Sequence, residues 1–269
     1  MKFFATILSL ALGASASCIG HARRADGMVK TNYFNYTATG GPLNWYGLDE
    51  DANSACAMGK HQSPIVIDTQ GIDYVTPGSL YFNIPKAGPS KLENLGSGLE
   101  VVLTNGSLTA GNKTYSLAQF HFHTPSEHRV NNEYYPMEVH FVFQNSHKEN
   151  AVVGFFFQLS ELGYSVPLFD SIFDRVSEIE EPGAFIMTGQ MDFSGLAEHL
   201  QSHGIYQYTG SLTTPPCSEE VAWYISTQPL PLNVQGYNKV KKVLKYNARY
   251  TQNSLGEDNL LTVAANSLQ

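Results

Sequence analysis

The sequence predicts a single domain of the β-rich α+β class, and two observations carry this prediction. Short runs of β-branched and aromatic residues recur along the chain, and clusters of Gly, Pro and Asn separate them. Helical periodicity is sparse and confined to three short segments. Apolar residues make up 42% and charged residues 15% of the 269 residues, which suits a globular chain with a large core. We therefore expect strands at the centre and helices at the periphery.

The expected elements follow in chain order. Strands are predicted over residues 101–103, 115–123, 137–145 and 152–159. Helices are predicted over 167–176, 196–200 and 235–246; in the last of these, one side carries Tyr237, Val240, Val243 and Leu244. No internal repeat or linker interrupts the chain after Gly41, so residues 41–269 are expected to form one domain.

The N-terminus has the pattern of a secretory signal peptide. Lys2 precedes an apolar run of about ten residues, and small residues follow it. A membrane anchor would need roughly 20 apolar residues. We expect residues 1–18 to be the signal, with cleavage near 16–18, and residues 19–40 to be a flexible leader. Arg23-Arg24 is either a second processing site or an exposed pair. The protein is thus predicted to be secreted and extracellular, without a membrane partner.

The charge balance limits the partners. A formal net charge of −8 argues against nucleic acid, because phosphate binding needs clustered Lys and Arg. The densest basic run is best explained as the solvated face of a helix; it consists of Lys239, Lys241, Lys242 and Lys245. A small-molecule substrate is the remaining expectation.

Secretion gives meaning to the cysteines and to three sequons. An oxidising compartment favours a disulfide between Cys56 and Cys217. Cys18 is either removed with the signal or retained, so the chain is expected to be a monomer or a dimer joined through Cys18. N-glycosylation acceptors of the Asn-x-Ser/Thr type begin at Asn35, Asn105 and Asn112.

The stretch Gln119-Phe120-His121-Phe122-His123 carries the strongest chemical signal. Side chains alternate across a strand, so Gln119, His121 and His123 share one face and the two phenylalanines share the other. Two imidazoles two residues apart are roughly 7 Å apart at the backbone, which allows both to bind one metal ion. A lone His-x-His in a strand is nevertheless more often incidental, and a solvated sheet face would show the same alternation.

A second run, from Met137 to Phe143, places Glu138, His140 and Val142 on one face. If an antiparallel hairpin joins the two runs, His140 lies across from the first histidine pair. Three neutral imidazoles then leave a fourth tetrahedral position open, as in a catalytic zinc site. Gln119 and Glu138 each precede a histidine by two residues, where they can accept its second ring N–H.

Several motifs resemble those of α-class carbonic anhydrases of a secreted eukaryotic type, such as those of fungi. They occur in the family order from about Trp45 to the C-terminus. The matching segments are His61-Gln-Ser-Pro-Ile65, Gln119-Phe-His-Phe-His123, Ser126-Glu-His128, Glu138-Val-His140, Ala151-Val-Val-Gly154, Tyr208-Thr-Gly-Ser-Leu-Thr-Thr-Pro-Pro-Cys217 and Asn247-Ala-Arg249.

The resemblance implies a central, mostly antiparallel sheet of about ten strands and the zinc-dependent, reversible hydration of CO2 to bicarbonate and a proton. It implies that Thr213 and Glu127 are catalytic, with the Thr213 hydroxyl donating to an ionised Glu127. It implies that the backbone carbonyl of Asn247 accepts a hydrogen bond from one ligand histidine. In this role the Asn247 side chain is expected to matter little. The residues implied for the substrate pocket are Val142, Val152, Leu212, Thr214, Val221 and Trp223.

One position departs from the family pattern. Fast members carry a proton-shuttling histidine after an Asn-x-Gly segment, and Ser97 stands there in this chain. Cys56 and Cys217 fall where secreted relatives have their disulfide.

The sequence leaves two other functions open. One is a non-catalytic recognition domain, which the presence of all three histidines disfavours. The other is a cupin-type metal oxygenase, which normally has a carboxylate ligand.

Overall fold

The computed structural model describes residues 28–268. The predicted signal peptide, Cys18, Arg23-Arg24 and the first part of the predicted leader lie outside the described residues. In the described part no helix is both long and apolar enough to span a membrane.

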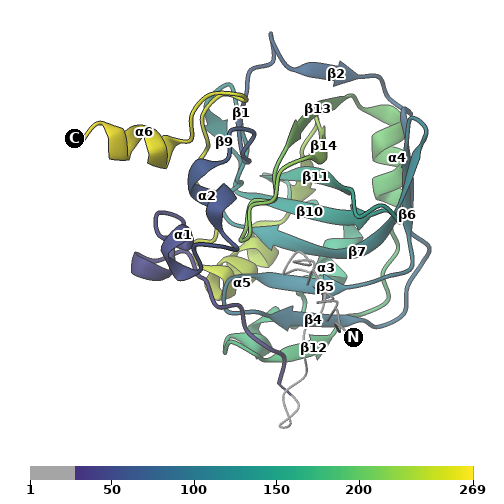
Figure 1. Cartoon of the computed structure of the whole chain (residues 1–269). Coiled ribbons are helices and arrows are strands. Elements are labelled where there is room, and N and C mark those ends of the chain that lie inside the picture. The colour runs from purple at the N-terminus through teal and green to yellow at the C-terminus, as the bar shows by residue number, and fades with distance from the viewer. Residues whose placement is uncertain (1–27, 269) are drawn as a thin grey trace, which may run out of the picture.

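A sheet of twelve strands forms the centre of the molecule (Figure 1). Its main path runs β12-β4-β5-β7-β10-β11-β14-β13-β2, and β3, β6 and β15 attach beside it. Their bounds are β2 Asp73–Val75, β3 Leu80–Asn83, β4 Lys91–Asn94, β5 Leu99–Val102, β6 Ser107–Ala110, β7 Lys113–His123, β10 Met137–Gln144, β11 Asn150–Leu159, β12 Phe185–Met187, β13 Ile205–Gly210, β14 Val221–Ser226 and β15 Leu230–Leu232.

The sheet is mostly antiparallel, as expected. Within this sheet, as far as the described residues show, only the pairings of β11 with β14 and with β15 are parallel. The sheet has twelve strands, where the family resemblance implied about ten, and this count includes very short strands such as β12 and β15. A small second sheet consists of β1 Val66–Ile67, β8 Arg129–Val130 and β9 Glu133–Tyr134.

Short helices surround the sheet. The predicted helices are observed as α3 Pro167–Phe173, α4 Ser194–Ser202 and α5 Val234–Leu244. The α5 helix begins after Asn233, whose side chain accepts a hydrogen bond from the N–H of Gly236. The other helical segments are η1 Ala38–Gly40, α1 Trp45–Leu48, α2 Ser54–Met58, η2 Val176–Ile179 and α6 Leu260–Asn266.

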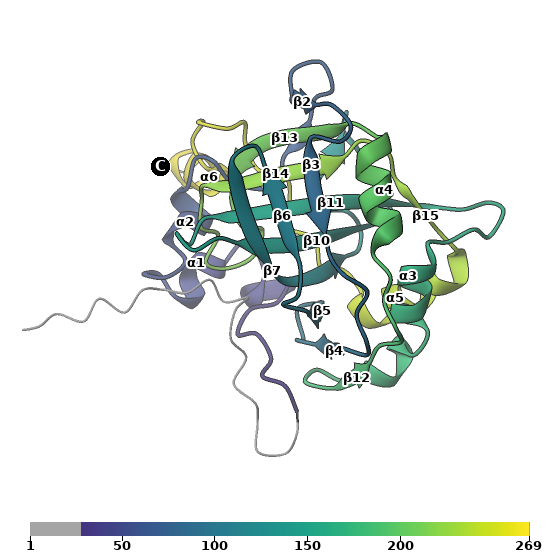
Figure 2. The same ribbon diagram turned by 90° about the vertical axis from the view of Figure 1, so that its right-hand side faces the viewer.

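The two faces of the sheet differ in what they bury. Helices α3, α4 and α5 cover one face, where their apolar side chains join the main core (Figure 2). Phe120, Phe122 and Phe141 point into this core, and the rings of Phe120 and Phe141 stack at 4.8 Å. The alternate residues of β7 and β10 therefore point to the opposite face, where the predicted metal ligands lie.

Residues 28–40 correct the prediction of a flexible leader. Val29 and Phe34 are buried, and the N–H of Asn32 donates to the carbonyl of Leu95. Too few apolar residues occur in this segment to form a periodic pattern, yet those present pack onto the edge of the sheet. Part of the segment that we expected to be a leader thus forms a wall of the molecule.

Candidate metal centre

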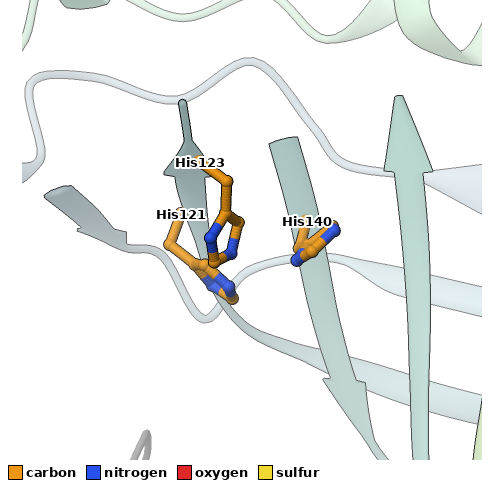
Figure 3. Close-up of side chains that lie close together, drawn as sticks. All are labelled: His121, His123 and His140. Atoms are coloured by element: carbon orange, nitrogen blue, oxygen red, sulfur yellow. The ribbon is translucent and has the colours of Figure 1, made fainter. Parts of the chain in front are cut away.

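Strands β7 and β10 bring His121, His123 and His140 together. In the antiparallel register His121 pairs with His140, and His123 pairs with Glu138. The three rings point toward one another (Figure 3), and one ring nitrogen from each lies within 4.8 Å of the others. The side chains of His140 and His123 are fully buried and therefore shielded from solvent. The pairing that the hairpin argument required is present.

Each ring is held through its second nitrogen. Nδ1 of His121 lies 2.8 Å from Oε1 of Gln119, and Nδ1 of His123 lies 2.8 Å from the carbonyl oxygen of Asn247. Nε2 of His140 lies 2.7 Å from Oε1 of Glu138. Carbonyl and carboxylate oxygens only accept hydrogen bonds, so these three nitrogens donate. The lone pairs that remain, on His121 Nε2, His123 Nε2 and His140 Nδ1, are the converging atoms.

Burial keeps the three imidazoles neutral. It lowers the pKa of His123 to about 3, with a further contribution from His140. It also lowers the pKa of His121 well below its ordinary value and lowers that of His140. Neutral imidazoles with exposed lone pairs are the protonation state that a metal ion requires.

Glu138 anchors a buried network behind the cluster. Its Oε1 accepts from His128 Nδ1 at 2.7 Å as well as from His140, and its Oε2 accepts from two backbone N–H groups. Burial alone would raise the pKa of Glu138, but the two histidines hold it well below its usual range. His128 Nε2 continues the network to the hydroxyl of Tyr208, at 2.7 Å. Tyr208 was a motif residue without a role in the sequence interpretation, because its partner is 80 residues away.

Glu127 lies beside the converging nitrogens. Its Oε2 is 3.4 Å from His123 Nε2 and 3.9 Å from His140 Nδ1. Its Oε1 accepts a hydrogen bond of 2.8 Å from the N–H of Arg249. Burial raises the pKa of Glu127 well above its usual value, although the Arg249 N–H and the Thr213 side chain act in the opposite direction. A nearby cation would therefore favour the ionised form of this carboxylate.

An apolar cavity of about 10 Å³ opens beside the histidines. Among the predicted pocket residues, five line it together with His121, His140 and Thr213: Val142, Val152, Leu212, Thr214 and Trp223. The sixth, Val221, is buried in the same apolar cluster but does not line the cavity. Val221 and Trp223 lie on the same face of β14 but two residues apart along the strand, so only Trp223 reaches the cavity.

A second cavity of about 40 Å³ lies on the other side of His121 and Thr214. Ser97 lines it, as do Asn32 and Phe34 from the segment before the first helix. Glu100 also lines this cavity. It lies across from His121 on β7 and from Glu93 on β4, and both carboxyls are buried. Burial, and then the neighbouring Glu93, raise the pKa of Glu100 to about 8.

Neither Asn32 nor Glu100 was identified from the sequence. Alternation along 99–102 could have placed Glu100 on a buried face, but an acidic residue in a short strand gave no reason to choose that face.

The side chain of Asn247 has a larger role than expected. Its Oδ1 accepts from the N–H of Thr124 at 2.8 Å, and its Nδ2 donates to the carbonyl of Phe122 at 2.8 Å. These two bonds clamp the backbone on both sides of His123, while the Asn247 carbonyl holds the ring. The expectation that this side chain matters little needs correction, because the fold brings Asn247 against the end of β7.

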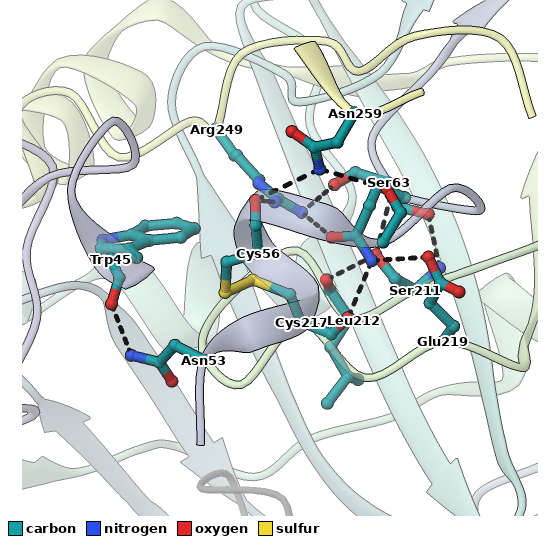
Figure 4. Close-up of a disulfide and its surroundings, with 12 residues drawn as sticks. Trp45, Asn53, Cys56, Ser63, Ser211, Leu212, Cys217, Glu219, Arg249 and Asn259 are labelled. Carbon is teal, nitrogen blue, oxygen red and sulfur yellow. Dashed lines mark hydrogen bonds between the residues drawn. A yellow bond between two sulfur atoms is a disulfide. The ribbon is translucent and has the colours of Figure 1, made fainter. Parts of the chain in front are cut away.

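The disulfide between Cys56 and Cys217 is present, with sulfur atoms 2.04 Å apart. The N–H of Cys217 donates to the carbonyl of Thr214, so the bridge braces the loop that carries Thr213 (Figure 4). The buried guanidinium of Arg249 donates to the carbonyls of Cys56 and Ser63. One residue thus links the bridge to Glu127, a connection that no sequence pattern indicated.

Comparison with known proteins agrees with this geometry. Residues 40–261 match the profile of the family described as eukaryotic-type carbonic anhydrase. A fungal α-carbonic anhydrase structure from Aspergillus oryzae is 71% identical, with a TM-score of 0.84, and covers 87% of this chain and 99% of its own. An α-carbonic anhydrase from Thermovibrio ammonificans is 31% identical, with a TM-score of 0.73, over 84% and 96% of the two chains. A carbonic anhydrase of Nostoc sp. is 31% identical over 245 residues, 90% of this chain and 89% of its own.

Proposed function

Because the chain belongs to the eukaryotic-type carbonic anhydrase family, we propose that it hydrates CO2 reversibly with a zinc ion held by His121, His123 and His140. The observation that carries the zinc assignment is the set of three converging lone pairs. The donor set consists of neutral imidazoles only, which suits Zn²⁺ with a fourth position open. His123 Nε2 is buried and has no hydrogen-bond partner among residues 28–268, a costly arrangement unless a cation occupies the space beside it.

When bound, Zn²⁺ acts as a Lewis acid that brings the pKa of a coordinated water into the neutral range, as is general for carbonic anhydrases. An all-histidine ligand set leaves the charge of the ion undiminished. The chain's own contribution is to hold the three rings rigidly through Gln119, Glu138 and Asn247.

Thr213 and Glu127 form the orienting pair in this proposal. An ionised Glu127 accepts from the Thr213 hydroxyl, which fixes the direction in which the hydroxyl oxygen presents its own lone pairs. The hydroxyl oxygen then accepts a hydrogen bond from the attacking O–H group and so directs its oxygen toward CO2. Burial disfavours the ionised form of Glu127. A dication among the neighbouring nitrogens would restore it, which is a second reason why these residues fit a metal ion.

The apolar cavity beside the histidines provides the place for CO2. CO2 has no net dipole and is therefore suited to an apolar slot. Val142, Val152, Leu212 and Trp223 line this slot, where water competes poorly with CO2. Thr214 lines both this slot and the second cavity, so it is positioned to contact bicarbonate.

The hydration assay tests the proposal. Purified protein is analysed for metal, and CO2 hydration is followed by stopped flow before and after removal of the metal with a chelator. We expect about one zinc per chain, activity that falls with chelation, and recovery on adding zinc. A chain without metal and without hydration would favour a recognition domain, and iron in the site would favour an oxygenase. Either result would overturn the proposal.

We also infer that the chain is a secreted glycoprotein. The disulfide supports an oxidising compartment. The three sequon asparagines, Asn35, Asn105 and Asn112, are exposed and thus accessible to modification. Expression in a eukaryotic host followed by glycosidase digestion tests this. A mass that digestion leaves unchanged, or retention of the protein inside the cells, would contradict it.

A further inference from the structure

Two histidines outside the metal centre lie together at the C-terminal end of α4. His199 belongs to the last turn of the helix, and His203 is its C-cap residue. Leu196 and Leu200 of the same helix are buried in the main core, so α4 covers the face of the sheet opposite to the three-histidine cluster (Figures 1 and 2). The pair is therefore separate from the centre described above.

The two rings are closer together than any two rings of the three-histidine cluster. Their centroids are 4.3 Å apart, with an angle of 30° between the planes. In the three-histidine cluster the corresponding separations are 4.6, 5.0 and 5.3 Å. A spacing of four residues puts both side chains on one side of the helix end.

Hydrogen bonds fix the tautomer of both rings. Nε2 of His199 lies 3.0 Å from the carbonyl oxygen of Gln228, which can only accept, so Nε2 carries the proton. Nδ1 of His203 lies 3.0 Å from the carbonyl oxygen of His199 and therefore carries its proton too. Each neutral ring is left with one lone pair, on His199 Nδ1 and on His203 Nε2. This is the way metal-binding histidines are usually held, with the other ring N–H donated to a backbone carbonyl.

The surroundings of the two rings suit a positive ion. The C-terminal end of a helix carries a partial negative charge, which stabilises a positive ion there. Partial burial, and then the neighbouring His203, lower the pKa of His199, so its lone pair is available at neutral pH. Both side chains are half-buried, which leaves the pair open to ions in solution.

We propose that His199 and His203 form a second, exchangeable binding site for a divalent transition-metal ion that prefers imidazole. Two protein ligands leave the remaining positions to water, so this site is weaker than the three-histidine centre. Cu²⁺ binds most tightly to nitrogen ligands among the divalent ions of its row, which makes it the best probe. Binding would tie the last turn of α4 to its C-cap residue.

The test is a titration of the zinc-loaded protein with Cu²⁺, followed by calorimetry and electron paramagnetic resonance. We expect one copper site in the wild type whose apparent Kd is weakened roughly tenfold or more in His203→Gln. His199→Gln should have the same effect on copper binding. His203→Gln is the cleaner variant because its ring donates only to the helix's own carbonyl. CO2 hydration should be unchanged in this variant.

His147→Gln is the matched control, since it removes an exposed histidine far from α4 in the chain. His21 and the amino terminus, outside the described residues, can also bind Cu²⁺, so the site is counted as the difference between wild type and variant. Copper should raise the melting temperature of wild type more than that of His203→Gln. Equal stoichiometry and affinity in these two proteins, or an equal loss of binding in His147→Gln, would overturn the proposal.

Discussion

Nδ2 of Asn32 donates a hydrogen bond of 2.6 Å to the Oγ of Ser97 in the cavity beside the three histidines. This contact joins the N-terminal segment to Ser97, the position at which the family resemblance leads us to expect a titrating histidine in fast members. Ser97 cannot accept a proton near neutral pH, and its hydroxyl is already engaged by Asn32. Ser97 therefore cannot carry the proton out of the site, and another group or the buffer must do so in the proposed function.

We predict that turnover is limited by proton release. In wild type, stopped-flow CO2 hydration should rise with imidazole concentration, whereas Ser97→His should raise the rate in dilute buffer by roughly tenfold or more. Combining it with Asn32→Ala should add to the gain, because the amide no longer competes for that space. Ser97→Ala is the control and should bring no gain. A wild-type rate that is already saturated in dilute buffer would contradict the idea.

A second prediction concerns the orienting pair. Thr213→Val keeps the shape of the side chain but removes the hydroxyl, so kcat/KM should fall about 100-fold while the metal content stays constant. Glu127→Gln should lose a similar factor, and the double variant should lose less than the product, because the two groups act together. Thr209→Val on the exposed face of β13 serves as the control. Independent, multiplicative losses would rule out a coupled pair.

The disulfide should support both stability and activity. Cys56 and Cys217 are 161 residues apart, and replacing both with Ser should reduce the free energy of unfolding by about 2–4 kcal/mol. Hydration should fall as well, because Cys217 fixes the Thr214 backbone. Thermal unfolding and initial rates are measured on the double variant and on reduced wild type. Unchanged melting after reduction would count against this role.

The Asn247 side chain should affect metal retention. Asn247→Ala keeps the carbonyl that holds His123 but removes both backbone clamps, so zinc affinity should drop by about tenfold. Competition with a chelating dye measures this loss. Asn238→Ala on the exposed surface of α5 is the matched control. Equal zinc affinity in wild type and Asn247→Ala would return the side chain to the minor role that the sequence suggested.

Glu100 should make stability depend on pH. Its pKa is about 8 in the folded chain and near 4.5 when exposed, so between these values the unfolded state is ionised and the folded state is protonated. The unfolded state then binds fewer protons, and stability falls as pH rises through this window, by up to about 1.4 kcal/mol per pH unit. Glu100→Gln should remove this slope in urea unfolding of the metal-free protein.

Glu161→Gln, in an exposed loop, is the control for that measurement and should keep the wild-type slope. If wild type and Glu100→Gln lose stability equally between pH 5 and pH 8, the buried carboxyl at position 100 is not the cause.

Much of the candidate site could be predicted from local pattern. Alternation placed His121 and His123 on one face and Phe120 and Phe122 on the other, and the structure has this arrangement. Gln119 and Glu138 were identified for the same reason, because a strand of period two puts residues i and i+2 side by side. These are relations within one strand, which the sequence alone can reveal.

What escaped prediction depends on contacts between distant segments. Residues 28–40 lack a periodic pattern, and only their packing against Leu95 and Ser97 shows that they line the cavity. Glu100 approaches His121 through strand pairing, and Arg249 reaches Cys56 across 193 positions of sequence.

The sequence by itself determined the β-rich class, the three histidines and the residues that share their strands, because strand periodicity is a local property of the backbone. Only the tertiary structure decided which residues hold the backbone around His123, what occupies the space at Ser97 and how His199 and His203 are oriented. Those contacts follow from the register of the sheet and the paths of its loops, which no short stretch of sequence encodes.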